Sequence, residues 1–223
     1  LVSMYTASKT LYQKSLGTES AVVIDLKGQA PALPAEQPPG TKPEKPAAWV
    51  PRIAGVYELT DPSGLADSWQ VIEANLNQAL KSMPLPMPLG GMTPVSSDKN
   101  GITTWFYPLP IGGNDLLPCV SVNDKVFMLG TSKSLHETLA ARLQLPASTP
   151  ALTGTHYRLS FAAVRTFLKN LNTATLPGVS TESASTALPW VAPFGDVRGR
   201  IWQEGDVLRQ SFHLEANDLR KVD

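Results

Sequence analysis

The segment that most constrains the fold is 118–143, PCVSVNDKVFMLGTSKSLHETLAARL. Its first half has two short runs rich in apolar residues on either side of Asn123-Asp124, which predicts two antiparallel strands, at 117–122 and 125–130, joined by a tight turn. Its second half repeats leucine every four residues, which predicts an amphipathic helix. The segment carries no catalytic motif, so it informs about architecture rather than activity.

The predicted helix begins with capping residues. We expect Ser132 or Ser134 to cap it, and Glu137 to complete a capping box because it follows Ser134 by three residues. The side chains expected to face inward are Leu135, Leu139 and Leu143.

The same kind of pattern predicts the remaining elements. Asp61 is placed to cap a helix with Pro62 in its first turn, and apolar residues then recur every three or four positions up to Met83. Further helices are expected at 2–16, 161–171 and 180–188. Strands are expected at 20–26, 52–60, 102–109 and 155–160, and a closing hairpin within 196–216 is expected to turn at Glu204-Gly205.

The order of these elements predicts the fold class and the domain organisation. We expect an α+β fold, with a mostly antiparallel sheet of two related β-α-β-β-like units and helices packed on one face. An N-terminal helix and strand would occupy 1–28, and a proline-rich linker 29–51, which holds seven prolines. The first unit would span 52–150 and the second 151–223, together forming one domain.

Three segments carry a resemblance to a known group of proteins. PRIAGVYELTDPSGLADSWQVIEANL, CVSVNDKVFMLGTSKSLHETL and RIWQEGDVLRQSFHLEA resemble parts of a domain-of-unknown-function family of uncharacterised bacterial envelope and secreted proteins. This resemblance implies export, to the periplasm or cell envelope, and supplies no catalytic residues. Because the sequence begins at Leu1, we expect a processed or trimmed chain with any targeting segment upstream.

Composition excludes some partners. Lys and Arg number 19 and Asp and Glu also 19, so a general electrostatic attraction to nucleic acid or anionic lipid is not expected. No apolar run approaches the length of about 18 residues that a membrane span requires. The single cysteine, Cys119, lies in a predicted strand and is expected to be a buried core residue.

Motifs of known chemistry are incomplete. His136-Glu137 begins like the helix of a zinc protease, but Ala140 stands where the second histidine would be. We therefore expect the histidines to be polar surface residues, with neither a metal nor a cofactor. Ser96 and Lys99 match S-x-x-K, but in an expected loop and without a K-T-G partner. The aromatic run 105–107 allows a carbohydrate platform as an alternative.

One group of residues suggests a binding surface. Side chains alternate between the faces of a strand, so the strands at 155–160 and 196–216 should direct apolar residues toward the core and basic residues outward. Arginine binds carboxylates and phosphates with a planar fork, and tryptophan offers a stacking plate. The residues predicted to share this outer face are His156, Arg158, Arg198, Arg200, Trp202, Arg209 and His213.

The sequence thus predicts a non-catalytic exported binding or structural domain that presents this face to a small anionic ligand or a protein partner. In the alternative interpretation, the face is merely solvated and its arginines pair with Glu204, Asp206 or Glu215. A hydrolase with a site assembled only in three dimensions is the competing class of function, and a structural spacer is a third.

Overall fold

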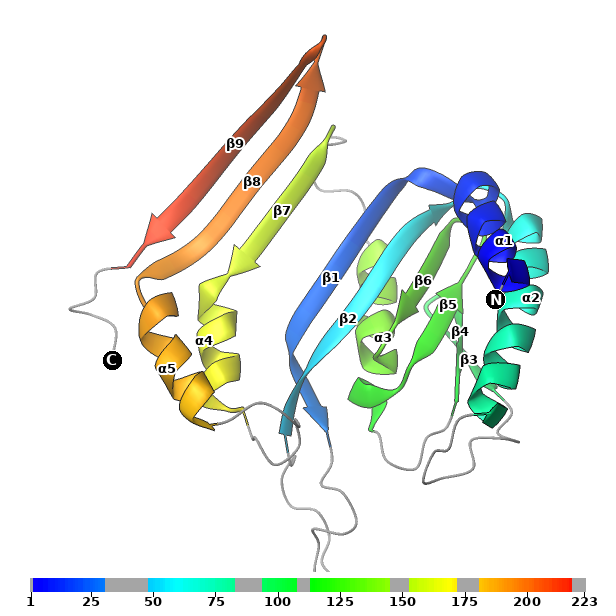
Figure 1. The fold of residues 1–223 in the computed structure, drawn as a ribbon, viewed down its shortest axis with the longest axis horizontal. Helices are drawn as coiled ribbons and strands as arrows, with labels where there is room; N and C mark the ends of the chain where they lie inside the picture. The colour runs from blue at the N-terminus through cyan, green and yellow to red at the C-terminus, as the bar shows by residue number, and fades with distance from the viewer. Residues whose placement is uncertain are drawn as a thin grey trace, which may run out of the picture. The chain divides into compact units, whose positions relative to one another are not determined.

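A computed structural model describes residues 2–30, 48–82, 94–107, 113–144, 153–171 and 181–217. The fold is α+β, as predicted, with five α-helices and two antiparallel sheets in these ranges (Figure 1). The chain packs as two compact units, one of Leu1–Asp25 with Arg52–Gln144 and one of Leu26–Pro51 with Leu145–Asp223. None of the described helices has the length and apolar character needed to cross a bilayer.

The larger sheet has six strands in the order β1-β2-β6-β5-β4-β3. The predicted hairpin is present as β5 and β6, and β6 pairs with β2 so that Met128 lies opposite Val56. The strands are β1 Leu16–Ala30, β2 Ala48–Leu59, β3 Val95–Lys99, β4 Ile102–Phe106, β5 Cys119–Val122 and β6 Val126–Gly130. Of the predicted linker 29–51, both ends therefore belong to strands, and 31–47 lies outside the described residues.

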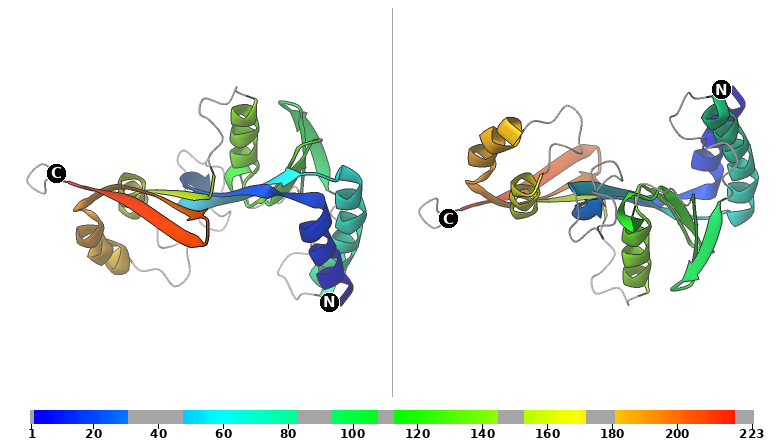
Figure 2. Two further views of the ribbon diagram at one scale, coloured as in Figure 1. Left: turned by 90° about the horizontal axis from the view of Figure 1, so that it is seen from above. Right: turned by 90° about the horizontal axis from the view of Figure 1, so that it is seen from below.

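Helices cover both faces of this sheet, whereas the sequence predicts them on one face only. Phe127 packs on one side with Leu65 of α2 and Leu11 of the π-helical turn η1. Met128, the next residue of β6, packs on the other side with Ala140 of α3. The two views of Figure 2 show α3 on the opposite side of the strands from α1 and α2. The elements are α1 Val2–Thr10, η1 Leu11–Ser15, α2 Pro62–Ser82, η3 Asn114–Leu116 and α3 Lys133–Leu143.

The starts of α2 and α3 follow from their capping residues. Asp61 accepts a hydrogen bond from the backbone N–H of Gly64 at 3.0 Å, which caps α2 as predicted. Ser132 accepts one from Leu135 N–H at 3.2 Å, so Ser132 rather than Ser134 caps α3. The predicted capping box is wrong, because Glu137 instead pairs with Lys99 at 2.6 Å.

Further local predictions also differ from the structure. The segment around Ser96 and Lys99, expected as a loop, is strand β3, which joins β4 through Asn100-Gly101. Both turn residues have positive φ, 55° and 68°, which suits the tight turn of a hairpin. Leu143 was expected to face inward and is 48% exposed, whereas Leu135 is buried. Met83 lies outside the described residues.

The smaller sheet has three strands in the order β7-β8-β9, β7 Thr155–Ser160, β8 Phe194–Glu204 and β9 Val207–Ala216. Two helices, α4 Phe161–Lys169 and α5 Thr181–Val191, follow β7 and precede β8. Phe161 and Phe194 bring their ring centroids to 5.3 Å, which fixes α4 against the start of β8. The closing hairpin turns at Gly205-Asp206, one residue beyond the predicted turn, with Gly205 at φ 60°.

Candidate functional site: the two faces of the three-stranded sheet

The structure places all the predicted site residues on one face of the three-stranded sheet. Arg158 lies opposite Arg198, which lies opposite His213 on β9. In the neighbouring row, His156 lies opposite Arg200. Trp202 and Arg209 form a third pair, and the alternation of the strands puts all three rows on one side, here called the polar face.

Acidic side chains of the same sheet pair with these arginines. Asp196 accepts hydrogen bonds from Arg158 at 2.6 and 3.1 Å, and lies 3.5 Å from Arg198. The hydrogen bond from Arg158, with one from Ser160, holds the pKa of Asp196 below its ordinary value. Arg198 also lies 3.9 Å from Glu215.

Two further arginines of the polar face also have partners within the chain. Arg209 forms an ion pair with Glu204. Arg200 donates to Thr153 twice, to its carbonyl oxygen at 3.0 Å and its hydroxyl at 2.7 Å, and lies 4.8 Å from the centre of the Trp202 ring. An anion that binds here must therefore replace interactions that the sheet already makes.

The opposite face of the same sheet is apolar. Its residues were expected to face the core, but five of them are open to solvent, Tyr157, Leu159, Leu208, Phe212 and Leu214. The register keeps them on one side, with Tyr157 and Phe212 in one row and Leu159 and Leu214 in the next. Their exposed fractions are Tyr157 36%, Leu159 45%, Leu208 73%, Phe212 70% and Leu214 42%.

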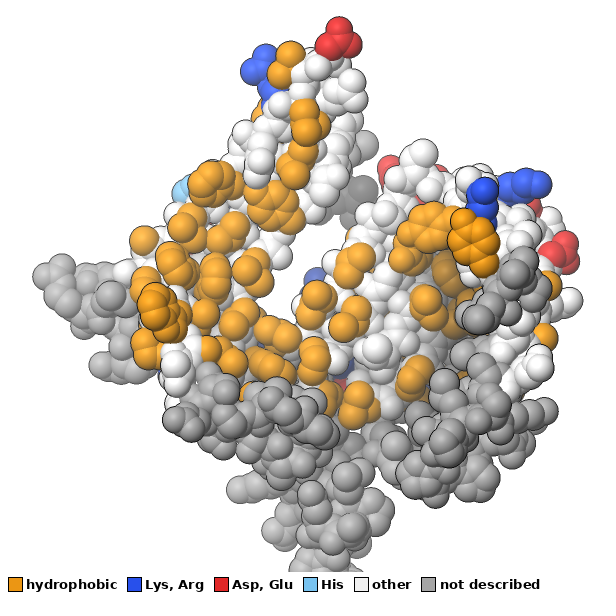
Figure 3. All heavy atoms as spheres, in the orientation of Figure 1, with side chains coloured by type: hydrophobic (Ala, Val, Ile, Leu, Met, Phe, Trp, Pro, Cys, Tyr) orange, Lys and Arg blue, Asp and Glu red, His pale blue; other side chains and the backbone are white. Residues whose placement is uncertain are grey.

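Figure 3 shows hydrophobic side chains gathered over β7, β8 and β9 on a single surface. Single exposed apolar residues are normal on soluble proteins, but a contiguous apolar surface usually marks an interaction site. This apolar face is therefore the feature of the three-stranded sheet that most needs a partner.

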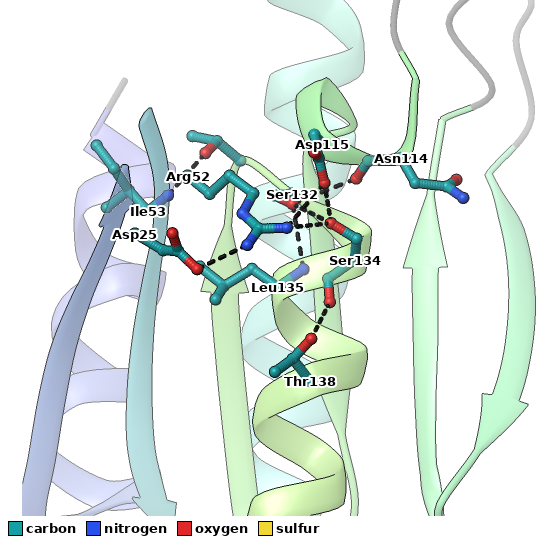
Figure 4. Close-up of polar contacts among 10 residues, drawn as sticks. Asp25, Arg52, Ile53, Asn114, Asp115, Ser132, Ser134, Leu135 and Thr138 are labelled. Atoms are coloured by element: carbon teal, nitrogen blue, oxygen red, sulfur yellow. Dashed lines mark hydrogen bonds and ion pairs between the residues drawn. The ribbon is translucent and has the colours of Figure 1, made fainter. Parts of the chain in front are cut away.

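A charged cluster forms around Arg52, and no motif in the sequence predicted it. The Arg52 guanidinium, 14% exposed, lies 2.6 Å from Asp25, 2.9 Å from Asp115 and 3.0 Å from the Ser134 hydroxyl (Figure 4). Burial lowers the pKa of Arg52, but hydrogen bonds to both carboxylates more than offset it, so its pKa is raised. The cluster connects β1, β2, η3 and α3. Its buried charges are therefore explained by a structural role in holding these four elements together.

A second polar cluster lies within the core. The Nδ1 atom of His136 is 2.8 Å from the Ser121 hydroxyl, which is 2.8 Å from the Thr104 hydroxyl. All three side chains are buried, so the expectation of a surface histidine is wrong for His136. Burial lowers the pKa of His136 to about 4. A Cβ on Gly130 would lie 2.5 Å from Nε2, so the bare glycine makes room for this ring.

The remaining candidates have structural surroundings. Cys119 is buried, as predicted, and burial raises its pKa to about 12. Lys99 of the S-x-x-K match forms an ion pair with Glu137. In the aromatic run 105–107, the Phe106 ring lies 4.5 Å from the Lys133 ammonium, measured to the centre of the ring. Across the ranges described, no group of three or more His, Cys, Asp and Glu side chains is placed to hold a metal ion.

No family model, no curated protein and no solved structure matches this chain.

Proposed function

We propose that this chain is a protein-binding domain of an exported bacterial envelope protein, and that its three-stranded sheet is the binding element. The observation that carries the proposal is the exposed apolar face, on which Phe212 and Leu208 are 70% and 73% exposed. Burying apolar surface is the main favourable term in most protein association, and a partner with its own apolar surface would provide it.

The pairing of the arginines on the polar face favours a protein partner over a small anion, because an anion would have to replace interactions that these arginines already make. On the polar face, four arginines stand beside three carboxylates that already pair with three of them. The fourth, Arg200, is engaged by Thr153. The polar face then acts as the solvated back of a sheet whose other side binds.

A hydrolase gains little support from the arrangement of residues. The contact between Ser121 and His136 is the nearest approach to a nucleophile and its base. Both side chains are fully buried, so a substrate could not reach the serine hydroxyl in this conformation.

Export is the part of the proposal that rests on sequence alone. Its support is the resemblance of the three quoted segments to envelope proteins. Fractionation of the cells that make the protein tests it, with recovery in the periplasmic or envelope fraction expected and recovery in the cytosol contradicting it.

Photo-crosslinking tests the binding element. A benzophenone side chain would be introduced at Leu159, on the apolar face of β7, and separately at Arg158, the adjacent residue on the polar face. We expect covalent products with a protein partner in the producing cells from position 159 and few from 158, since the two side chains point to opposite faces.

The neighbouring positions form a matched pair, because both are exposed and lie on the same strand. Equal yields from both positions, or no product from 159, would contradict the proposal. Replacement of Tyr157 by lysine, in the chain carrying the probe at 159, should reduce the yield of covalent product below that of the probe alone, because it places a charge within the binding surface.

A further inference from the structure

Strand β9 forms an edge of the three-stranded sheet. Among the strands that the structure describes, it has a neighbour, β8, on one side only (Figure 1). The pairing with β8 is regular from Val197 opposite Leu214 to Glu204 opposite Val207, and the one irregularity lies between Phe194 and Val197. The outward N–H and C=O groups of a regular edge strand form a template on which another strand can pair.

This edge lacks most of the usual protection against pairing, since its charges are one of each sign, Arg209 and Glu215. Natural edge strands are commonly blunted by proline, by charged side chains and above all lysine, by a bulge in their middle or by being short. Residues 207–216, VLRQSFHLEA, contain neither proline nor lysine, and every one of them is exposed. The strand is therefore suited to pairing with a second strand.

We propose that β9 pairs antiparallel with β9 of a second copy of this chain, around a two-fold axis at Phe212. Residues that oppose each other in an antiparallel pair point to the same face, so Phe212 meets Phe212 of the second copy on the apolar face. On the polar face, Arg209 meets Glu215 of the second copy, and the symmetry repeats this contact.

The charges select this register. If the axis passed through Ser211 instead, Arg209 would oppose His213 and Glu215 would oppose Val207, which leaves both charges without a partner across the strands. A shift by an odd number of residues would place apolar side chains opposite polar ones. Only the register around Phe212 keeps almost the full strand paired and opposes each charge by its opposite.

The two charged residues can accept a second partner. Arg209 and Glu215 have side chains that are 54% and 46% exposed in the single chain. Each already contacts a residue of β8, Glu204 and Arg198 respectively. A new contact on the outer side of β9 extends these rows of alternating charge without breaking them.

Pairing would join two three-stranded sheets into one sheet of two chains. Their apolar faces would then lie on the same side, because a two-fold axis perpendicular to a sheet preserves its faces. The dimer interface runs along the β9 edge and so differs from the apolar face that the proposed function uses.

Complementary charge reversals test this pairing on the full chain. In sedimentation equilibrium, the wild type is expected to form a dimer. Arg209→Glu creates two contacts between like negative charges in its homodimer, and Glu215→Arg creates two between like positive charges, so each should self-associate about tenfold more weakly or worse. An equimolar mixture of the two variants should recover the wild-type affinity, because position 209 of each chain would then oppose a residue of opposite charge at position 215 of the other.

Recovery on mixing separates the interface from effects within each chain, since a locally damaged sheet would not be repaired by the other variant. Arg158→Glu is the matched control: it makes the same charge change on the same face of β7, and should leave the dimer unchanged. A monomeric wild type, charge reversals without effect, or a mixture that stays weak would overturn the pairing. None of these outcomes alters the crosslinking expected at position 159, so the two proposals fail separately.

Discussion

His136 makes the stability of the domain depend on pH. Burial lowers its pKa to about 4, from an ordinary value near 6.5, so the folded chain keeps the ring neutral where the unfolded chain protonates it. Above pH 6.5 the ring is neutral in both states and costs the fold nothing. As pH falls from 6.5 toward 4, protonation of the unfolded chain progressively lowers the free energy of unfolding. Over that interval the free energy of unfolding should drop by about 3 kcal/mol from this group.

Urea unfolding at pH 7, 5.5 and 4 measures this drop, with His136→Asn as the comparison because its amide can still reach Ser121. The variant should be less stable at pH 7, yet lose about 3 kcal/mol less between pH 7 and 4. Parallel pH profiles for the two proteins would show that another group is responsible. Carboxylates with lowered pKa, such as Asp196, act on both proteins alike and cancel in the comparison.

At the scale of single residues, the sequence predicted the face of the strand on which a side chain lies better than it predicted the partners of that side chain. The period of two along a strand was enough to place Arg158, Arg198 and Trp202 on one face, because side-chain alternation is a property of the backbone. The partners of those side chains depend on register and on residues far along the chain. Asp25 and Arg52 are 27 residues apart, and no local pattern links them.

At the scale of the elements, Ser132 determines where α3 begins. Its hydroxyl accepts from Leu135 N–H and donates to the Asn114 carbonyl at 3.2 Å, and its side chain is buried. Ser132→Ala should therefore cost about 1 to 2 kcal/mol in the free energy of unfolding, because a helix N–H and a carbonyl lose their partner together.

Thermal and urea unfolding measure this cost, with Thr138→Ala as the control on the exposed side of the same helix. Thr138 is exposed and donates to the Ser134 carbonyl within its own helix, so its replacement should change stability by less than about 0.5 kcal/mol. A loss for Thr138→Ala as large as for Ser132→Ala would mean that the cap has no special role.

The elements with strong periodicity were predictable, and those with weak periodicity were not. Apolar spacing identified α2 and α3 because each helix buries one stripe. Strand β3 escaped notice because Val95 is its only apolar residue, and the Asn100-Gly101 turn was its remaining signal. The unbroken apolar run of β6, 126–129, is typical of a strand covered on both faces, which is what the two clusters around it show.

At the scale of the whole molecule, the sequence could not show which faces are covered. Alternation identifies the residues that share a side of a strand, but burial depends on what packs against that side. Tyr157, Leu159 and Phe212 have the pattern of core residues and lie on an exposed surface. The contrast between pattern and exposure is itself the observation on which the proposed function rests.

The division into two compact units predicts how the molecule unfolds. Phe127 belongs to the cluster of the larger sheet with Leu59 and Leu65, and Phe194 packs on Phe161 in the other unit. Phe127→Ala should cost about 3 to 5 kcal/mol, because a buried ring leaves a cavity. Since substitutions in separately packed units act independently, the cost should fall on the unit that contains Phe127.

Hydrogen exchange read by mass spectrometry resolves the two units. Phe127→Ala should speed exchange in β5, β6 and α2 while β8 and β9 keep their wild-type rates, and Phe194→Ala should do the reverse. If either substitution speeds exchange equally across both units, the chain unfolds as a single cooperative body. In that case the three-stranded sheet would draw its stability from the rest of the chain, and variants of β9 should be compared only at matched global stability.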